Sequence, residues 1–149
     1  MNNLQEKFNK AVALHQAGRL PEAKESYKGL LSHIKNVDLY SLLAIACFDL
    51  KQYGEAISYS QEGLKFEQRK DLLEIIANSY VYLNDAQNAI QFYIKITETD
   101  PNDADAFLVL AKTLYKSNQL YRAAEAYLKA AQLNPAYATI YEPIGNILS

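Results

Sequence analysis

The sequence predicts an all-α solenoid in which antiparallel helix pairs are stacked one after another. Four segments share one pattern, and they read AGRLPEA (17–23), LKQYGEA (50–56), LNDAQNA (83–89) and SNQLYRA (117–123). Their last alanines are Ala23, Ala56, Ala89 and Ala123, which recur at a nearly constant spacing. A fixed period of this length, roughly 34 residues, is typical of stacked repeats.

Apolar residues upstream of three of these alanines recur at i, i+3, i+4 and i+7. The stripes are Tyr40, Leu43, Ala44 and Cys47; Leu73, Ile76, Ala77 and Tyr80; and Phe107, Leu110, Ala111 and Leu114. This spacing predicts an amphipathic helix in the first half of each repeat. No segment alternates with a period of two, so we expect no strand.

The second half of each repeat has an apolar stripe of its own. These stripes are Leu20, Ala23, Tyr27 and Leu30; Tyr53, Ala56, Ile57 and Leu64; Ala86, Ala89, Ile90, Tyr93 and Ile96; and Leu120, Ala123, Ala124, Tyr127 and Ala130. Pro21 stands at the start of such a helix, where its missing N–H costs nothing. Asp103 precedes a stripe and is expected to cap its helix. Each repeat therefore consists of two helices joined by a short polar turn.

The recurring positions resemble the tetratricopeptide repeat, in which W-x2-L-G-x2-Y and then G, Y, A, F, A and P occupy fixed slots. We assign repeats 4–36, 37–69, 70–103 and 104–137 within a single domain, 1–149. Residues 138–149 resemble the first helix of a fifth repeat. The resemblance implies a right-handed superhelix of nine helices. Repeat two departs from the pattern at Ser60 and Gly63, so we expect it to be the most loosely packed.

Composition and charge exclude several classes of protein. Half of the 149 residues are hydrophobic and 21% are charged, which is typical of a globular chain. The formal net charge of −2 lacks the basic excess of a nucleic-acid binder. No apolar run is long enough to span a membrane, and no signal-peptide core precedes the first repeat. We therefore expect a cytoplasmic protein without nucleic-acid partners.

Catalytic and metal-binding patterns are also missing. Cys47 lies in an apolar stripe, as a buried small side chain would. His15 and His33 lie in different helices without ligand spacing. The acidic stretch 98–105 lacks the glycine and the final glutamate of a calcium loop, because Asp105 and Ala111 stand there. We therefore expect no enzymatic activity, no cofactor and no metal.

A second face of each first helix lies about 130° from the core stripe. In the tetratricopeptide family this face lines a concave groove that binds peptides. By that resemblance the expected partner-binding residues are Phe8, Val12, Ile45, Phe48, Glu74, Asn78, Tyr82, Leu108, Lys112 and Tyr115. The alternative is that the face serves packing alone, with Asp38, Asp71 and Asp105 stabilising the first turns of their helices.

Charge on this face indicates the kind of partner. It carries four acidic residues, Asp38, Asp71, Glu74 and Asp105, against one lysine, Lys112. Family members that clamp a terminal carboxylate place Lys and Asn where this chain has Phe8 and Val12. We therefore expect a protein or peptide partner with apolar anchors and some basic residues.

The two ends of the array differ. Lys7 and Lys10 occupy positions that are apolar in every later repeat, as expected of an N-terminal cap. At the other end, Tyr141, Ile144 and Leu148 form an apolar stripe without a covering helix. We expect this edge to meet a second molecule, through self-association, or a continuation of the chain.

Three functions fit the sequence. The first is a non-catalytic scaffold that binds a peptide segment of a partner in its groove. The second is an N-terminal recognition module of a longer enzyme, because AVALHQAGRLPEA (11–23) resembles the start of bacterial proteins that continue into a transferase domain. The third is a self-assembling structural scaffold joined through its edges.

Overall fold

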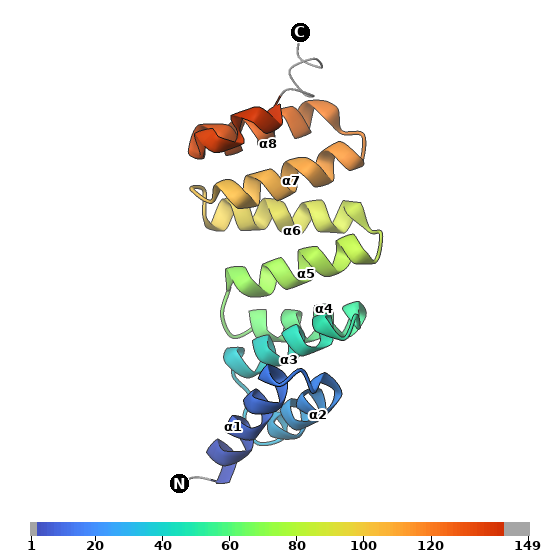
Figure 1. The fold of residues 1–149 in the computed structure, drawn as a ribbon, viewed down its shortest axis with the longest axis vertical. Coiled ribbons are helices and arrows are strands. Elements are labelled where there is room, and N and C mark those ends of the chain that lie inside the picture. Colours follow the sequence, from blue (N-terminus) through green and yellow to red (C-terminus); the bar gives the residue numbers. More distant parts are fainter. Residues whose placement is uncertain (1–2, 142–149) are drawn as a thin grey trace. The chain divides into compact units, whose positions relative to one another are not determined.

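The computed structural model describes residues 3–141, which form eight α-helices and a closing 3-10 helix (Figure 1). The elements are α1 (Asn3–Gln16), α2 (Leu20–Leu31), α3 (Val37–Asp49), α4 (Tyr53–Leu64), α5 (Lys70–Tyr82), α6 (Ala86–Thr99), α7 (Ala104–Lys116), α8 (Leu120–Leu133) and η1 (Pro135–Tyr141). No strand occurs in residues 3–141, so the all-α fold of helix pairs is confirmed. The helix expected over 138–149 lies outside the described residues beyond Tyr141, and its beginning belongs to η1.

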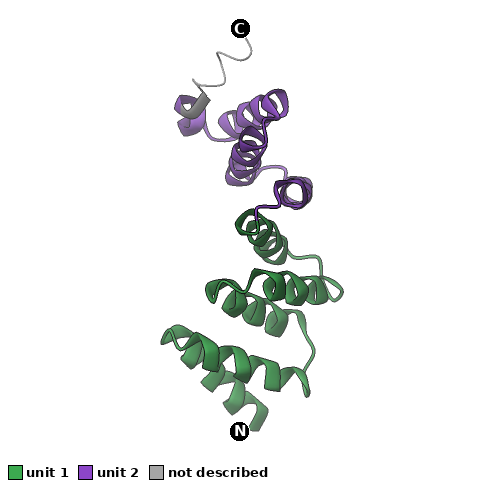
Figure 2. Ribbon diagram, turned by 90° about the vertical axis from the view of Figure 1, so that its right-hand side faces the viewer, with its two compact units in different colours: residues 1–83 green, residues 84–149 purple. Residues whose placement is uncertain are grey.

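The chain divides into two compact units, residues 1–83 and 84–149 (Figure 2). In unit 1, which contains α1 to α5, each helix packs against the next one, and α3 also contacts α5. In unit 2, α6 packs on α7, α7 on α8, and α8 on η1. Packing between neighbours in the sequence is the arrangement expected of stacked repeats.

Each α-helix has a completely buried alanine that recurs with the period of the repeats. Ala11, Ala44, Ala77 and Ala111 lie on the first helices, and Ala23, Ala56, Ala89 and Ala123 lie on the second helices. A methyl side chain lets two helix backbones approach more closely than any larger apolar group. Their burial at a constant period explains why the same pairing recurs along the chain.

Each short turn between paired helices holds one residue in the left-handed region. These residues are Gly18 (φ 78°), Lys51 (62°), Asn84 (60°) and Asn118 (62°). In the first turn the Arg19 N–H donates to the Leu14 carbonyl at 2.9 Å, which closes a Schellman motif. Glycine adopts this conformation freely and asparagine tolerates it. Lys51 is therefore the one residue of the four that is strained by its turn.

Repeat two is tightly packed around Gly63, so the expectation of a loose second repeat is wrong there. A Cβ on Gly63 would lie 2.9 Å from Leu72 Cδ1 and 3.1 Å from Tyr40 Cβ. Leu72 is fully buried, as is Ser60 one turn before Gly63. Side chains of neighbouring helices occupy the space that a side chain at position 63 would need. The sequence of a single repeat does not reveal this packing.

A buried lysine ties α2 to α4. Lys24 Nζ lies 2.6 Å from Glu55 Oε2 and donates to Gln52 Oε1 at 2.5 Å. The hydrogen bond to Glu55 is the main cause of a raised pKa for Lys24, against the opposing effect of burial. Lys24 therefore stays charged inside the packed repeats, where it is only 8% exposed.

Arg69 connects the first turns of α3 and α5. Its guanidinium donates to Asp38 Oδ1 at 2.5 Å and to both oxygens of Asp71, at 3.0 and 2.8 Å. The Ser41 hydroxyl donates to Asp71 Oδ2 at 2.9 Å. Burial acts to raise the pKa of Asp71, but the bonds from Arg69 and Ser41 outweigh it and hold that pKa below its usual value.

The helix cap that the sequence predicted is present in the structure. The Asp103 side chain accepts a hydrogen bond from the Ala106 N–H at 3.1 Å, as expected. Asn36 and Asp85 cap α3 and α6 in the same way. Pro21 lies in the first turn of α2.

We predict that Lys51→Gly raises the free energy of unfolding by about 0.5 kcal/mol. Glycine removes the strain of the left-handed conformation in the folded state. This gain in stability exceeds the loss that comes from the larger conformational entropy of glycine in the unfolded chain. The same change at Asn84 is the control and should give a smaller gain, because asparagine tolerates this conformation. Urea unfolding measures both. A loss of stability in Lys51→Gly contradicts the prediction.

We predict opposite effects for one substitution at two helical glycines. Gly63→Ala should lower the free energy of unfolding by about 1–3 kcal/mol, because the new methyl group overpacks against Leu72 and Tyr40. Gly29→Ala should raise it by about 0.5–1 kcal/mol, since nothing lies within 4 Å of a Cβ there. Two changes of the same sign would show that Gly63 is not closely packed.

We predict that Arg69→Gln costs about 1 kcal/mol of stability at pH 7, a small value because the pair is partly exposed. The pKa of Asp71 is lowered in the folded state, so this stabilisation is complete above the ordinary carboxyl pKa of about 3.9 and is lost as the pH falls through the folded-state value. The stabilities of wild type and variant should therefore converge in acid. A gap that stays constant down to pH 2.5 contradicts this assignment.

Candidate binding face

Seven of the predicted partner-binding residues lie on the three first helices of unit 1, which are α1, α3 and α5. We call Phe8, Val12, Ile45, Phe48, Glu74, Asn78 and Tyr82 the first-helix face of unit 1. Phe8, Val12 and Phe48 are half-buried and pack against the hydrophobic core of this unit. Ile45 and Asn78 are also half-buried, whereas Glu74 and Tyr82 are exposed. Part of the face therefore supports the core, as the packing alternative expected, and part is open to solvent.

An aromatic cluster lies where α3 and α5 end and α4 begins. The Phe48 ring meets the Tyr53 and Tyr82 rings edge to face, at centroid distances of 5.4 and 5.6 Å. Tyr53 and Tyr82 stack 4.9 Å apart with their planes 6° from parallel. Such pairs add about 0.5–1.5 kcal/mol beyond the burial of area. Tyr82 is nevertheless 64% exposed, so one of its faces is held in place while the rest is open to contact.

Tyr53 is the member of this cluster that the sequence did not predict. Its position matches a packing slot, and we expected it to be a core residue. In the structure it is half-buried in the first turn of α4. Tyr53 comes directly after the turn of repeat two, and this position in the sequence could have indicated that it lies near the ends of α3 and α5.

His15 has a structural role at the edge of this face. Its Nδ1 lies 3.1 Å from the Tyr27 hydroxyl and its Nε2 lies 3.3 Å from Asp49 Oδ2. The imidazole thus links α1, α2 and α3.

The charge of the face is less acidic than the sequence count suggested. Asp38 and Asp71 are both paired with Arg69, which we did not count because it precedes α5. Glu74 stays exposed on α5 and Asp49 is exposed at the end of α3. Asp49 Oδ2 lies 3.3 Å from His15 Nε2.

The remaining predicted residues lie in unit 2. Lys112 is exposed and Tyr115 is 44% exposed on α7. Leu108 differs from the expectation, because only 8% of it is exposed and it offers little surface to a partner. Asp105 accepts a hydrogen bond from the Tyr137 hydroxyl of η1. Ile144 and Leu148 lie outside the described residues and Tyr141 ends η1, so the C-terminal edge stays a prediction.

Cys47 is the single thiol and is fully buried. Burial raises its pKa to about 11, although the charge of Lys24 acts to lower it. The thiol is therefore protonated at neutral pH and is a poor nucleophile. Within residues 3–141 no three His, Cys, Asp or Glu side chains are grouped to hold a metal ion. No helix in the same range has the length and apolar character needed to cross a membrane.

Comparison with solved structures identifies the fold. A double mutant of MamA from Desulfovibrio magneticus RS-1 superimposes with a TM-score of 0.86 and 21% identity, over 100% of this chain and 87% of that chain. YrrB, described as a tetratricopeptide repeat protein with an unusual peptide-binding site, superimposes with a TM-score of 0.81 and 20% identity, over 95% of this chain and 75% of that chain. A tetratricopeptide repeat protein from Parabacteroides merdae superimposes with a TM-score of 0.86 and 19% identity, over 95% of this chain and 58% of that chain. At these identities the likeness concerns the fold alone.

Sequence comparison identifies the repeat itself. No protein with a curated description matches the chain significantly. Residues 76–138 match the family model for the tetratricopeptide repeat, over the second half of the array. The first half has the same spacing of buried alanines and the same left-handed turns. Residues 76–138 therefore match the tetratricopeptide repeat, and the first half of the chain resembles it in these features.

Proposed function

We propose that this protein is a non-catalytic interaction scaffold, and that the first-helix face of unit 1 binds a peptide segment of a partner protein. The aromatic cluster is the observation that carries the proposal. Tyr82 is fixed by Tyr53 and Phe48, yet most of its surface is open. A rigid exposed tyrosine loses little entropy on binding, which is why tyrosines are frequent at interface hot spots.

Neighbouring side chains supply polar recognition. Asn78 lies one helical turn before Tyr82 on α5 and is half-buried. Its amide has both a donor and an acceptor, so it can pair with the backbone of an extended peptide whatever its sequence. Glu74, one turn earlier, favours a lysine or arginine in the partner. We therefore expect a segment that combines an apolar or aromatic anchor with a basic residue.

Unit 2 presents a smaller set of the same kind. Lys112 and Tyr115 are exposed on α7, one turn apart, and we include them as further contact residues for a protein partner. The peptide-binding site described for YrrB, which has the same fold, supports a peptide as the ligand class. The cytoplasmic location, the transferase module and self-assembly stay predictions from the sequence.

Selection from a phage-displayed peptide library against the whole chain tests the proposal. The dissociation constant of an enriched peptide is then measured by fluorescence anisotropy for wild type and variants. Tyr82→Ala should weaken binding at least about fivefold, and Tyr82→Ala with Asn78→Ala at least about tenfold, as at interface hot spots.

Tyr121→Ala is the matched control, because Tyr121 is a 70% exposed tyrosine on α8, outside the proposed face. It should leave the dissociation constant unchanged within about twofold. Circular dichroism checks that every variant keeps its helical content. Equal effects of Tyr82→Ala and Tyr121→Ala, or a library without binders, would contradict a peptide-binding role for this face.

A further inference from the structure

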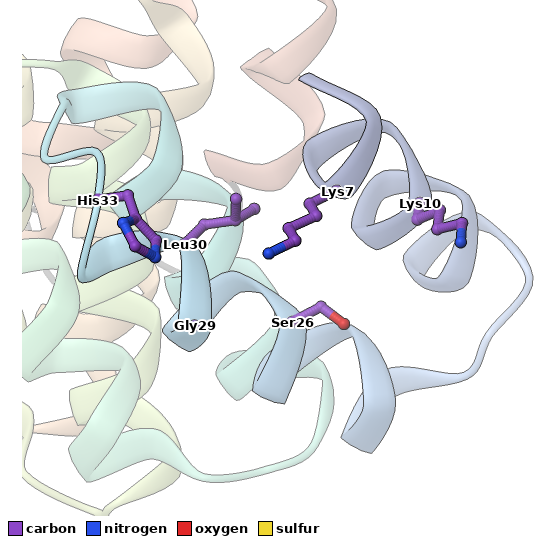
Figure 3. A pocket seen from close by; sticks show the side chains of 6 residues that line it. All are labelled: Lys7, Lys10, Ser26, Gly29, Leu30 and His33. Atoms are coloured by element: carbon purple, nitrogen blue, oxygen red, sulfur yellow. The ribbon is translucent and has the colours of Figure 1, made fainter. Parts of the chain in front are cut away.

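A hollow of about 230 Å³ opens between α1 and α2, and none of the residues that line it belongs to the first-helix face. Six residues line it: Lys7, Lys10, Ser26, Gly29, Leu30 and His33 (Figure 3). Lys7 extends into the gap between the two helices, toward Leu30 and His33. Its volume is below that of a site for a drug-sized molecule, so it fits one or two side chains.

The next repeat has an aromatic pair at the corresponding positions. One repeat further along the chain, Tyr40 corresponds to Lys7 and Phe66 corresponds to His33. The Tyr40 and Phe66 rings stack 5.9 Å apart, close to Gly63. In repeat one a lysine and a histidine replace this aromatic pair, and the space stays open. A hollow of similar size, about 240 Å³, lies at the equivalent position of repeat four, where Phe107 and Leu110 replace the two lysines and Glu125 is part of the lining. The hollow of repeat one is therefore distinguished by its two lysines and by the absence of a lining carboxylate.

The lining is basic without a compensating acid. Lys7 and Lys10 are exposed, and neither makes an ion pair with another described residue. His33 faces the same space, and no carboxylate lines it. Leu30 supplies an apolar wall, and the absence of a side chain at Gly29 leaves room for a close approach. The hollow thus combines an apolar floor with two ammonium groups at its rim.

We propose that this hollow is a second binding site, which accepts an acidic segment of a protein partner. One apolar side chain of the partner enters between Gly29 and Leu30, and flanking carboxylates pair with Lys7 and Lys10. Charge complementarity sets the partner chemistry, because desolvated like charges would repel a basic segment. This preference is opposite to the one proposed above for the first-helix face.

The probe is a short fluorescein-labelled peptide with one central leucine flanked on both sides by glutamates, titrated with the whole chain at low salt. We expect saturable binding that weakens with ionic strength. Lys7→Glu with Lys10→Glu should weaken it at least about tenfold. Lys35→Glu with Lys51→Glu changes the net charge equally at exposed positions outside the hollow, and should leave the affinity within about twofold.

A variant that leaves the charge unchanged tests whether the shape of the hollow is needed for binding. Gly29→Leu places a side chain in the hollow and improves helix propensity, so the protein stays folded while the cavity is filled. It should also weaken binding at least about tenfold, whereas Gly54→Leu, at another open helical glycine, should not. Absence of saturable binding to the wild type, or equal losses in the variants and their controls, would overturn the proposal.

Discussion

The close packing of helices around small buried side chains is the constraint on which the rest of this structure depends. Each α-helix carries a completely buried alanine that recurs with the repeat period, and Gly63 leaves no room even for a methyl group. The small buried residue recurs in each helix, whereas the first-helix face of unit 1 stays partly open to solvent, at Glu74 and Tyr82. The aromatic cluster on this face holds Tyr82 in place while leaving it 64% exposed, and we propose that a partner binds there.

Much of the fold could be predicted from the sequence, because the buried positions recur with the same period as the sequence repeats. The alanine spacing and the apolar stripes predicted the helix pairs, and the Asp103 cap was predicted from local chemistry. Contacts between repeats were not predictable in the same way. Tyr53 stacks on Tyr82, and Arg69 pairs with Asp38, although the partners of each pair are far apart in the sequence. Periodicity indicates which face a residue occupies, but not which side chain of the next repeat it meets.

Departures from the repeat pattern carry the specific properties of this chain. Lys7, at a position that is apolar in later repeats, leaves a basic hollow where repeat two has stacked aromatic rings. Lys51 takes a left-handed turn position that glycine or asparagine occupies elsewhere. Gly63 replaces a bulky residue, and Leu72 and Tyr40 fill the space it leaves. The shared positions therefore explain the fold, while the departures explain local stability and the charge of each surface.

Chemical-shift mapping by NMR tests most directly whether the first-helix face of unit 1 is the peptide-binding surface. Isotope-labelled protein is titrated with a peptide enriched from the library, and the backbone amide resonances are followed. If the face binds the peptide, the largest shifts occur at Ile45, Phe48, Asn78 and Tyr82 and are absent along α2. Shifts confined to other surfaces, with these four amides unchanged at saturation, would contradict the proposed site.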